Sequence, residues 1–522
     1  MNLSDFDLRQ LADRDLSGLS AVDKDRLLGR LLGDLIEARE RLRANSRTSS
    51  RPPSSDPPWS GVDDEEEKTA EGCGRTPSEG HEEPVGGDEA EGLPPDGGRA
   101  GKAKPEGKKP GRKPGAAGHS RSVTLAVTAT VRHVPPECAL CGAGLPGEGF
   151  VARTGLYVLD LEMERGEGLL GLRASHRKHL YGDGGPCGCG HVTRSEPGRC
   201  PGEDRWEVGL TEWHLVGPTL ASLIVCLALR MRQSRRGIRE FLRDWFGIGL
   251  STATINQCLH EAGRAVEPLE ESLVEEVQAA ALAHADETAW KEAGQLLWLW
   301  VVATTTVSLY LIGYRTAELI TAALGEGFDG WLMSDGYRVY RQFHKRLRCW
   351  AHLQRKAKGL KDSLAKEARA FGDACDALLD ELMAAIYAAR ENPPPAGTLP
   401  ETYRSRLEEF RALCERHRES PHGKTRALAR EFLNDWDAVW IVLAHPHLPL
   451  TNNEAERALR HWVILRRISN GTRTEQGSRA LALLASVIET CRKRNQLPWP
   501  YLAQVIAERR KGNIAPPLPA AS

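Results

Sequence analysis

The sequence predicts a multidomain α+β protein, and three observations support this fold class. The chain has 522 residues, which is more than one hydrophobic core usually organises. Within residues 276–356, apolar runs of strand length are interrupted by one helical run, a pattern that predicts a mixed sheet. Residues 206–275 and 357–447, which flank that region, instead show helical periodicity.

Acidic and basic side chains are distributed unevenly along the chain. The formal net charge is −1, yet residues 47–100 hold 14 acidic and five basic side chains, a net charge of −9. The rest of the chain therefore carries a net charge of about +8, which favours a polyanionic partner such as DNA.

Hydropathy and cysteine content indicate the compartment. The sequence has no apolar run of about 18 residues, and its first residues lack the cationic start and apolar core of a signal peptide. Twelve cysteines in a chain of this length do not indicate a disulfide framework. We therefore expect a cytoplasmic protein with reduced thiols and no membrane partner.

The N-terminal part divides into a helix and a linker. Residues 1–46 predict a helix in which Leu28, Leu35 and Leu42 recur every seven residues. This stripe fits either a short coiled-coil seam between chains or an amphipathic helix packed on its own domain. Residues 47–122, first acidic and then basic, hold few large apolar side chains, so we expect a disordered linker.

The end of this linker, GKAKPEGKKPGRKPGAAGHSR, is strongly basic. Its clustered cations favour an arm that contacts DNA phosphates, and the alternative is a solvated linker. The main candidates for phosphate contact are Lys108, Lys109, Arg112 and Lys113.

Residues 123–205 contain two close cysteine pairs that predict a zinc-binding segment. The four thiols are those of Cys138, Cys141, Cys187 and Cys189. Thiolates suit Zn²⁺, a borderline-soft ion that favours tetrahedral sulfur sites, and the glycine after each pair lets the chain curl around a metal. Because one residue separates the second pair, His191 or Cys200 could replace Cys189. The alternative is a set of unrelated free cysteines.

The helical segment 206–275 includes a pair of helices joined by a short turn. Ser251 is a suitable N-cap for the second helix. The spacing is compatible with a helix-turn-helix, in which Arg235 and Arg236 would contact phosphates. The alternative is an ordinary helical hairpin without DNA contact.

Two aspartates lie near strand ends within residues 276–356. Asp286 ends an apolar run, and two strand-like runs, a helix and a short strand ending at Asp335 follow. Three meandering strands, a helix and a fourth strand begin an RNase H-like fold, in which the first and fourth strands are neighbours. The two carboxylates would then repel, and a divalent cation would relieve the repulsion. The alternative is that each aspartate merely caps a turn.

Residues 448–522 offer a third carboxylate at the start of a helix. Glu454 and Glu456 are both candidates, and Thr451, Asn452 or Asn453 can cap that helix. Positions two apart do not share a helix face, so only one glutamate should point toward the aspartates.

Several motifs resemble one known family. ADET, SDGYRVY, RCWAHLQRK, TNNEAERALR and RRISNGTRTEQGSRALALLASVIETCRKRN occur in this order. Together with the basic arm and the cysteine pairs, they resemble the insertion sequence 66 family of DDE transposases over roughly residues 100–510.

This resemblance implies an RNase H-like core that cuts and joins DNA strands. It assigns the acidic triad to Asp286, Asp335 and Glu456, with two Mg²⁺ or Mn²⁺ ions per active site. It makes residues 357–447 a helical insertion in the core. Cys349 and His352 are interpreted either as a structural or DNA-positioning element or as a buried cysteine and a capping histidine.

Further DNA contacts are expected around the triad, and some of these basic residues will simply be solvated. The candidates are Arg355, Lys356, Arg457, Arg460, Arg466 and Arg467. The expected partners are DNA at the element ends and target, further copies of the chain, and accessory proteins of the same element, at the bacterial nucleoid.

Two other functions fit parts of this pattern. A nuclease on the same fold would cut without joining, and the acidic triad does not separate it from a transposase. A zinc-containing DNA-binding regulator with an inactive core is the second alternative, and the presence of all three carboxylates argues against it.

Overall fold

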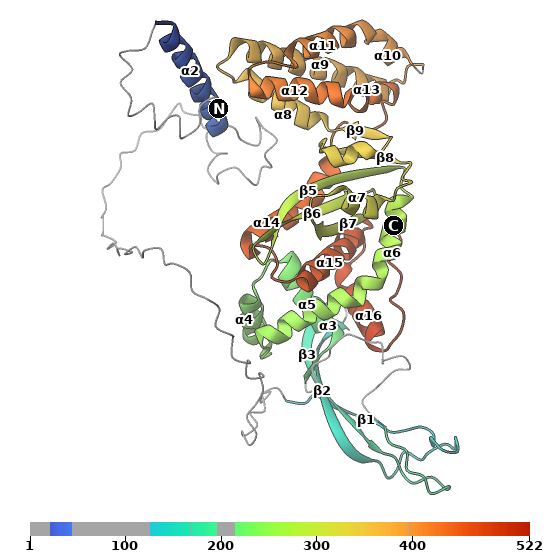
Figure 1. The fold of residues 1–522 in the computed structure, drawn as a ribbon. Helices are drawn as coiled ribbons and strands as arrows, with labels where there is room; N and C mark the ends of the chain where they lie inside the picture. The colour runs from blue at the N-terminus through green and yellow to red at the C-terminus, as the bar shows by residue number, and fades with distance from the viewer. Residues whose placement is uncertain (1–20, 44–125, 167–168, 196–213, 396, 522) are drawn as a thin grey trace, which may run out of the picture. The chain divides into compact units, whose positions relative to one another are not determined.

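The computed structural model describes residues 21–43, 126–166, 169–195, 214–395 and 397–521, which belong to one compact unit. Helices and two hydrogen-bonded sheets alternate along the chain, so the mixed α+β class is confirmed (Figure 1). No described helix combines the length and the apolar character that a membrane span needs.

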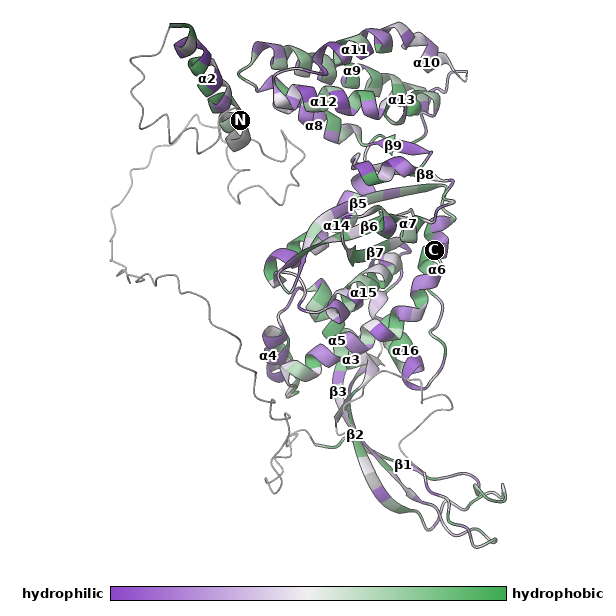
Figure 2. Ribbon diagram, viewed as in Figure 1, coloured by the Kyte–Doolittle hydropathy of each residue, from purple (hydrophilic) through white to green (hydrophobic). Residues whose placement is uncertain are grey.

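The first described element is the helix α2 (Ala21–Arg43). It covers part of the predicted N-terminal helix, and hydrophilic and hydrophobic residues alternate along it (Figure 2). The linker that follows lies outside the described residues. The same holds for the four basic side chains expected to contact phosphates, which are Lys108, Lys109, Arg112 and Lys113.

A four-stranded sheet follows, with the strand order β1-β3-β2-β4. Its strands are β1 (Ala129–His133), β2 (Val151–Gly166), β3 (Leu169–Asp183) and β4 (His214–Val216). The two long strands β2 and β3 form an antiparallel hairpin, and the short strands β1 and β4 pair with them in parallel. Residues 206–275 were expected to be helical throughout, and the strand β4 (His214–Val216) corrects this at their start.

The next elements are helical, as their sequence periodicity predicts. They are α3 (Pro218–Val225), the π-helix η4 (Cys226–Arg230), α4 (Arg235–Phe246), α5 (Thr252–Val266), the 3₁₀ helix η5 (Glu267–Leu269) and α6 (Glu270–Gln278). The hydroxyl groups of Ser234 and Ser251 accept hydrogen bonds from the first turns of α4 and α5. Gly247 ends α4 in a left-handed conformation. The expected pair of helices with a short turn is therefore present.

The second sheet has five strands in the order β7-β6-β5-β8-β9. They are β5 (Leu282–Glu292), β6 (Gln295–Ala303), β7 (Ser308–Gly313), β8 (Trp331–Ser334) and β9 (Arg346–Arg348). The first three form an antiparallel meander, and β8 and β9 add in parallel. The helix α7 (Ala317–Leu324) and the 3₁₀ helix η6 (Arg338–Gln342) lie between strands in the chain. As expected for the first and fourth strands, β5 and β8 are neighbours.

Local sequence explains this sheet. Ala293 and Gly294 join β5 to β6 with φ angles of 48° and 90°, and a two-residue turn with both φ angles positive matches the twist of a hairpin. Residues Leu299 to Ala303 of β6 are all buried, because helices cover both faces of the sheet at this strand. Hydrophobic residues lie along β6, β7 and the helix α15 (Figure 2).

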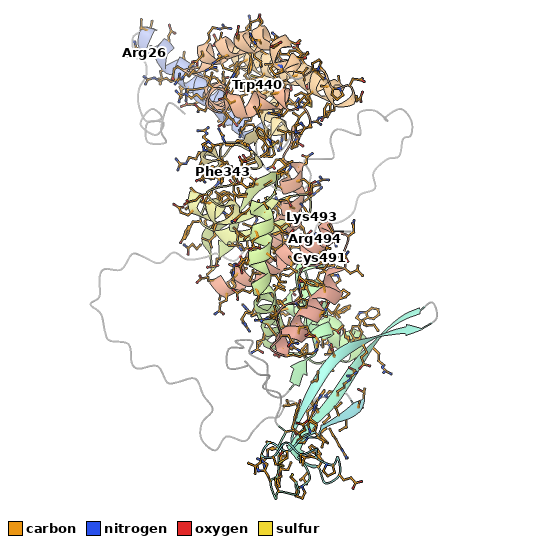
Figure 3. The ribbon with its side chains drawn as sticks, turned by 90° about the vertical axis from the view of Figure 1, so that its right-hand side faces the viewer. Arg26, Phe343, Trp440, Cys491, Lys493 and Arg494 are labelled. Atoms are coloured by element: carbon orange, nitrogen blue, oxygen red, sulfur yellow. The ribbon has the colours of Figure 1, made fainter. Side chains whose placement is uncertain are left out.

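The remaining elements are helices. They are α8 (Trp350–Lys361), α9 (Lys366–Glu391), α10 (Thr398–Thr402), α11 (Arg404–His417), α12 (Gly423–Asn434), α13 (Trp436–Ala444), α14 (Asn453–Ser469), α15 (Glu475–Lys493) and α16 (Pro498–Arg510). The helices from α8 to α13 form a core around Trp440 (Figure 3), to which Met333 of β8 and Leu347 of β9 also contribute. In this core Phe432 stacks on Trp440 with ring centroids 6.0 Å apart. The helices α14, α15 and α16 share a second core with the five-stranded sheet.

The helix α15 also closes an edge of that sheet. The strand β7 lies at the edge, where its outward backbone N–H groups would lack partners. The N–H of Tyr310 donates to Ser486 Oγ at 2.8 Å, and the N–H of Ser308 donates to Thr490 Oγ1 at 3.1 Å. Hydroxyl groups of α15 thus satisfy the backbone that another strand would otherwise pair with.

Candidate active site

Asp286 and Asp335 lie level with each other on neighbouring strands. The strands β5 and β8 pair in parallel with His284 opposite Met333, and the same register continued by two residues sets Asp286 opposite Asp335. Asp335 directly follows β8, as expected. Asp286 lies inside β5 and not at its end, because β5 continues into the hairpin with β6.

The electrostatics of this region are dominated by carboxylates. The pKa of Asp286 is well above its usual value because of burial, and the negative charges of Asp335, Glu287 and Glu456 raise it further. Backbone N–H groups partly compensate: that of Glu287 donates to Asp286 Oδ1 and that of Tyr337 donates to Asp335 Oδ1, both at 2.9 Å. A nearby cation would favour the charged form of Asp286 and so oppose this rise in its pKa.

The helix α14 directs its two first-turn glutamates to different places. Glu454 forms ion pairs with Arg457 and with Lys493, which lies at the end of α15 (Figure 3). Glu456 instead contributes to the raised pKa of Asp286. Positions two apart on a helix diverge in this way.

Hydrogen bonds at both ends fasten α14 to β5. The buried Asn452 lies at the N-cap position, but its side chain does not cap the helix: Nδ2 donates to the carbonyl of Ala285 at 2.9 Å. Near the other end, Arg466 donates to Thr288 Oγ1 at 2.9 Å and to the backbone carbonyl of Ala289, which also belongs to β5. These contacts fix the position of Glu456 along the strand that carries Asp286.

The helix α8 brings a cation and a histidine to Glu456. Arg355 Nη2 lies 3.3 Å from Glu456 Oε1, and His352 Nδ1 lies 3.5 Å from the same oxygen. Burial lowers the pKa of His352 to about 3, and the charges of Arg355 and Lys356 add to this effect. His352 is therefore neutral at physiological pH.

Two groups of potential metal ligands meet within the described part of the chain. One is the four-cysteine cluster, and the other joins Cys349, His352 and Glu456; within each group the ligand atoms lie within 4.8 Å of one another. The carboxylates of Asp286, Asp335 and Glu456 do not form such a group, although they act on one another electrostatically. Repulsion between them and the attraction of Glu456 to Arg355 account for this separation.

The cysteine pairs meet at the end of the four-stranded sheet. Cys138 Sγ lies 3.7 Å from Cys189 Sγ, and Cys141 Sγ lies 3.4 Å from Cys187 Sγ. The glycine after each pair has a positive φ, 69° after the first and 83° after the second, as the curling of the chain requires.

Two thiols of this cluster have pKa values shifted in opposite directions. A hydrogen bond from the backbone N–H of Cys141 is the main cause that lowers the pKa of Cys138 to about 6. A backbone hydrogen bond also acts to lower the pKa of Cys141, but the neighbouring sulfurs raise it to about 12. Of the alternative ligands, His191 is not in the cluster, and Cys200 lies outside the described residues.

A buried network around Glu287 was not predicted from the sequence. This side chain lies on the face of β5 opposite to that of its neighbour Asp286, and it accepts hydrogen bonds from Tyr340 at 2.5 Å and from Arg315 Nε at 3.0 Å. The guanidinium of Arg315 stacks over the ring of Tyr337, 3.7 Å from its centroid. Two features of the sequence could have indicated this network. They are the charged residue that follows Asp286 in ADET and the two tyrosines of SDGYRVY.

A second network joins the helical insertion to the turn that follows Asp335. The fully buried carboxylate of Asp435 accepts hydrogen bonds from Arg341 at 3.1 Å and Arg346 at 3.0 Å, and Arg348 Nε lies 3.5 Å away. Arg348 also packs against Gly336, where a Cβ atom would lie 1.1 Å from Nη1. With its φ of 96°, Gly336 suits both the turn and the close approach of Arg348.

The basic residues expected to contact DNA divide into two groups. Four of these residues have exposed side chains: Arg235, Arg236, Arg460 and Arg467. The other four are held by acidic groups or backbone oxygens of the chain itself, although one of them, Arg457, is also exposed: they are Arg355, Lys356, Arg457 and Arg466. The second group would have to exchange these partners before binding phosphate.

Comparisons with known proteins place the chain in a family. The model of the family described as Transposase IS66 family matches residues 214–480, about half of the chain, from β4 to the start of α15. Two relatives come from Sinorhizobium fredii (strain NBRC 101917 / NGR234). The uncharacterized protein y4qI is 25% identical over 311 residues, which cover 52% of this chain and 55% of the relative. The uncharacterized protein y4jO is 26% identical over 174 residues, which cover 33% and 51%.

The match thus spans about half the length of each of these relatives. The matched family region contains both aspartates, the helix with Glu456 and the insertion between them. The chain belongs to the IS66 family of transposases.

Proposed function

We propose that this protein is the transposase of an insertion sequence and that it cuts and joins DNA strands at the element ends. The observation that carries this proposal is the register of β5 and β8, which sets Asp286 opposite Asp335 beside the helix that carries Glu456. The strand order, an antiparallel meander extended by two parallel strands, is the order of an RNase H-like core.

The carboxylates fit Mg²⁺ or Mn²⁺. Asp286 is half-buried, its pKa is raised by the charges of Asp335 and Glu456, and a divalent cation would offset the repulsion between these carboxylates. We assign two ions to these three side chains. Such ions supply an activated water or DNA 3′-hydroxyl and stabilise the leaving oxygen. The chain itself holds the carboxylates in place through Asn452 and Arg466, which fasten α14 to β5.

For the cysteine cluster we propose a structural Zn²⁺ site. Four sulfurs within 4.8 Å of one another suit the tetrahedral coordination that Zn²⁺ prefers, and the curled backbone after each pair is already in place. Four protein ligands leave no open position, so this site would stabilise the sheet and take no part in catalysis.

DNA is the proposed partner, and further copies of the chain would hold the two element ends together. The exposed cations at the start of α4 and along α14 are candidates for phosphate contact. The basic arm near residue 110, outside the described residues, would add contacts that carry no sequence information. We also propose accessory proteins of the same element as partners.

The proposal is tested by replacing each triad carboxylate with its amide. Asp286→Asn, Asp335→Asn and Glu456→Gln should each lower the rate of DNA-end cleavage by at least about a thousandfold, because each removes a charged metal ligand. Binding of a DNA end, measured by gel shift, should persist, because the substitutions leave the exposed cations in place.

Glu454→Gln is the matched control, because Glu454 lies in the same turn of α14 but pairs with Arg457 and Lys493. It should retain most of the activity. Loss of cleavage in Glu454→Gln with normal cleavage in Glu456→Gln would overturn the assignment of the third carboxylate. The same assay with a target DNA separates a transposase from a nuclease, since only the transposase joins the cut end to the target.

A further inference from the structure

Cys349, His352 and Glu456 meet at the edge of the proposed active site, and neither aspartate is part of this group. Cys349 precedes α8, His352 lies in its first turn, and Glu456 comes from α14. Their ligand atoms lie within 4.8 Å of one another. We propose that these three residues bind a thiophilic divalent cation such as Zn²⁺, and that this ion inhibits the enzyme by occupying the carboxylate of Glu456.

The geometry suits such an ion. In a tetrahedral site with bonds of about 2.0–2.3 Å, neighbouring ligand atoms lie roughly 3.3–3.7 Å apart. His352 Nδ1 and Glu456 Oε1 are 3.5 Å apart. Cys349 is fully buried and His352 is 9% exposed, yet Nδ1 of His352 makes no hydrogen bond to any residue that the structure describes. A metal bond would give this nitrogen a partner.

The backbone around Cys349 is already held in position. Its N–H donates to the carbonyl of Ser334 at 3.0 Å, and the N–H of Trp350 donates to the carbonyl of Leu450 at 2.8 Å. The backbone N–H of Asn452 points at the sulfur, with the nitrogen 3.2 Å from Sγ. Burial raises the pKa of the Cys349 thiol to about 11, so this thiol loses its proton only when a metal replaces it, and the N–H of Asn452 then serves as a hydrogen-bond donor to the metal-bound sulfur. When the ion binds, the thiol proton leaves to solvent and the sulfur–metal bond replaces the S–H bond.

The donor set determines which ion binds. A thiol and an imidazole favour Zn²⁺ over Mg²⁺, which prefers oxygen ligands. Three protein ligands leave a fourth position for water. Arg355 now lies 3.3 Å from Glu456 Oε1, but it also donates to the carbonyl of Ala351 at 3.3 Å, so it has another acceptor when a metal takes its place.

The regulatory part of this inference rests on the proposed function, because Glu456 is also a proposed Mg²⁺ ligand. Once Oε1 of Glu456 binds zinc, the side chain is held on the side of α8 and no longer completes the site with the two aspartates. Excess zinc would therefore inhibit cleavage, whereas zinc at the four-cysteine cluster would support the fold.

The first experiment measures zinc content. Full-length protein is dialysed against buffered zinc and analysed by mass spectrometry. We expect about two zinc ions per chain in the wild type and about one in Cys349→Ser and in His352→Gln. Cys491→Ser, at a buried cysteine of α15 that belongs to neither group, is the control and should keep both zinc ions. Circular dichroism and retention of the first zinc show that each variant is folded. Equal zinc content in the wild type and both site variants would overturn the proposal.

The second experiment measures inhibition. Zinc is titrated into a Mg²⁺-supported cleavage reaction, and each rate is divided by that variant's own rate without added zinc. The wild-type rate should fall by roughly tenfold or more as the second site fills, and the rate of Cys349→Ser should fall much less. A second zinc ion that binds without affecting cleavage would overturn the regulatory part alone. If no variant cleaves DNA, the proposed function fails, and the zinc content still decides whether the metal site exists.

Discussion

A buried hydrogen bond from Tyr340 to Glu287 joins the strand that carries Asp286 to the segment that follows Asp335. Glu287 would be costly to bury without partners, and Tyr340 and Arg315 supply them. The turn after Asp335 is also fixed by the ring of Tyr337, against which Arg315 stacks. These side chains do not need to touch DNA to matter, because they position Asp335 relative to Asp286.

Removing the hydroxyl group of Tyr340 should therefore impair Mg²⁺-dependent cleavage more than DNA binding. In Tyr340→Phe the ring remains packed, but Asp335 is held less firmly, so cleavage at limiting Mg²⁺ should fall by roughly tenfold or more and recover partly at high Mg²⁺. Affinity for a DNA end should not change. Tyr501→Phe is the control, since its hydroxyl donates to the carbonyl of Pro516 at 2.8 Å in another part of the core. A similar Mg²⁺ dependence in both variants would contradict this role.

The same residues show what sequence alone could provide. Apolar runs of strand length, with one helical run between the third and fourth, made the order of the first four strands predictable, and with it the approach of Asp286 to Asp335. The partners of Glu287 were not predictable, because Tyr340 lies 53 residues away and nothing local connects them. Likewise, basic character alone could not distinguish Arg466, which is held by β5, from the exposed Arg467.

At the scale of single elements, α2 carries an apolar stripe that is open to solvent. Leu28 is 63% exposed and Leu35 is 51% exposed, and Leu32 between them is also exposed. The sequence left two interpretations, a seam between chains or packing on its own domain. We propose the seam between chains, because the heptad spacing places these leucines along one side of the helix, where a second copy could bury them. The side chain of Leu42 lies outside what the structure describes.

Leu35→Lys should weaken association between chains. The substitution puts an unpaired charge into the proposed seam, so sedimentation velocity of the full-length protein should show a shift toward monomer. Complexes with two DNA ends should decrease, and binding of one end should remain, because the proposed DNA contacts lie beyond residue 100. Arg30→Gln is a control at an exposed position between the leucines of the stripe. An unchanged sedimentation profile for Leu35→Lys would favour packing within the chain.

At the scale of the whole molecule, two hydrophobic cores are tied together at Asp435. This residue belongs to the insertion, whereas Arg341, Arg346 and Arg348 belong to the segment between β8 and α8. Burial alone would raise the pKa of Asp435, but hydrogen bonds from Arg341 and Arg346 and the charge of Arg348 lower it overall. The insertion therefore helps to shape the turn after Asp335, although it lies far along the chain from that residue.

Asp435→Asn should destabilise the protein by roughly 3 kcal/mol at neutral pH, because it removes the buried negative charge that Arg341, Arg346 and Arg348 share. A carboxylate with a lowered pKa in the folded state stabilises above its unfolded pKa of about 4, and this contribution is lost as the pH falls through the folded value. The difference between wild type and variant in urea unfolding should thus be constant from about pH 7 to 5 and shrink below about pH 4. A constant difference down to about pH 2 would show that the charge of Asp435 is not the cause.

Because α15 covers the edge strand β7, a gene copy that ends before α15 would encode an incomplete fold. A copy shortened by a stop codon within the insertion would still encode the hairpin sheet, the helices α3 to α6 and all five strands of the second sheet. It would lack the hydroxyl groups of Ser486 and Thr490, so the edge of β7 and the apolar face beneath α14 and α15 would be open. Such a product should aggregate in cells and not persist as a soluble competitor for DNA ends. In this family member, loss of the last third of the chain would therefore silence a copy without creating a repressor.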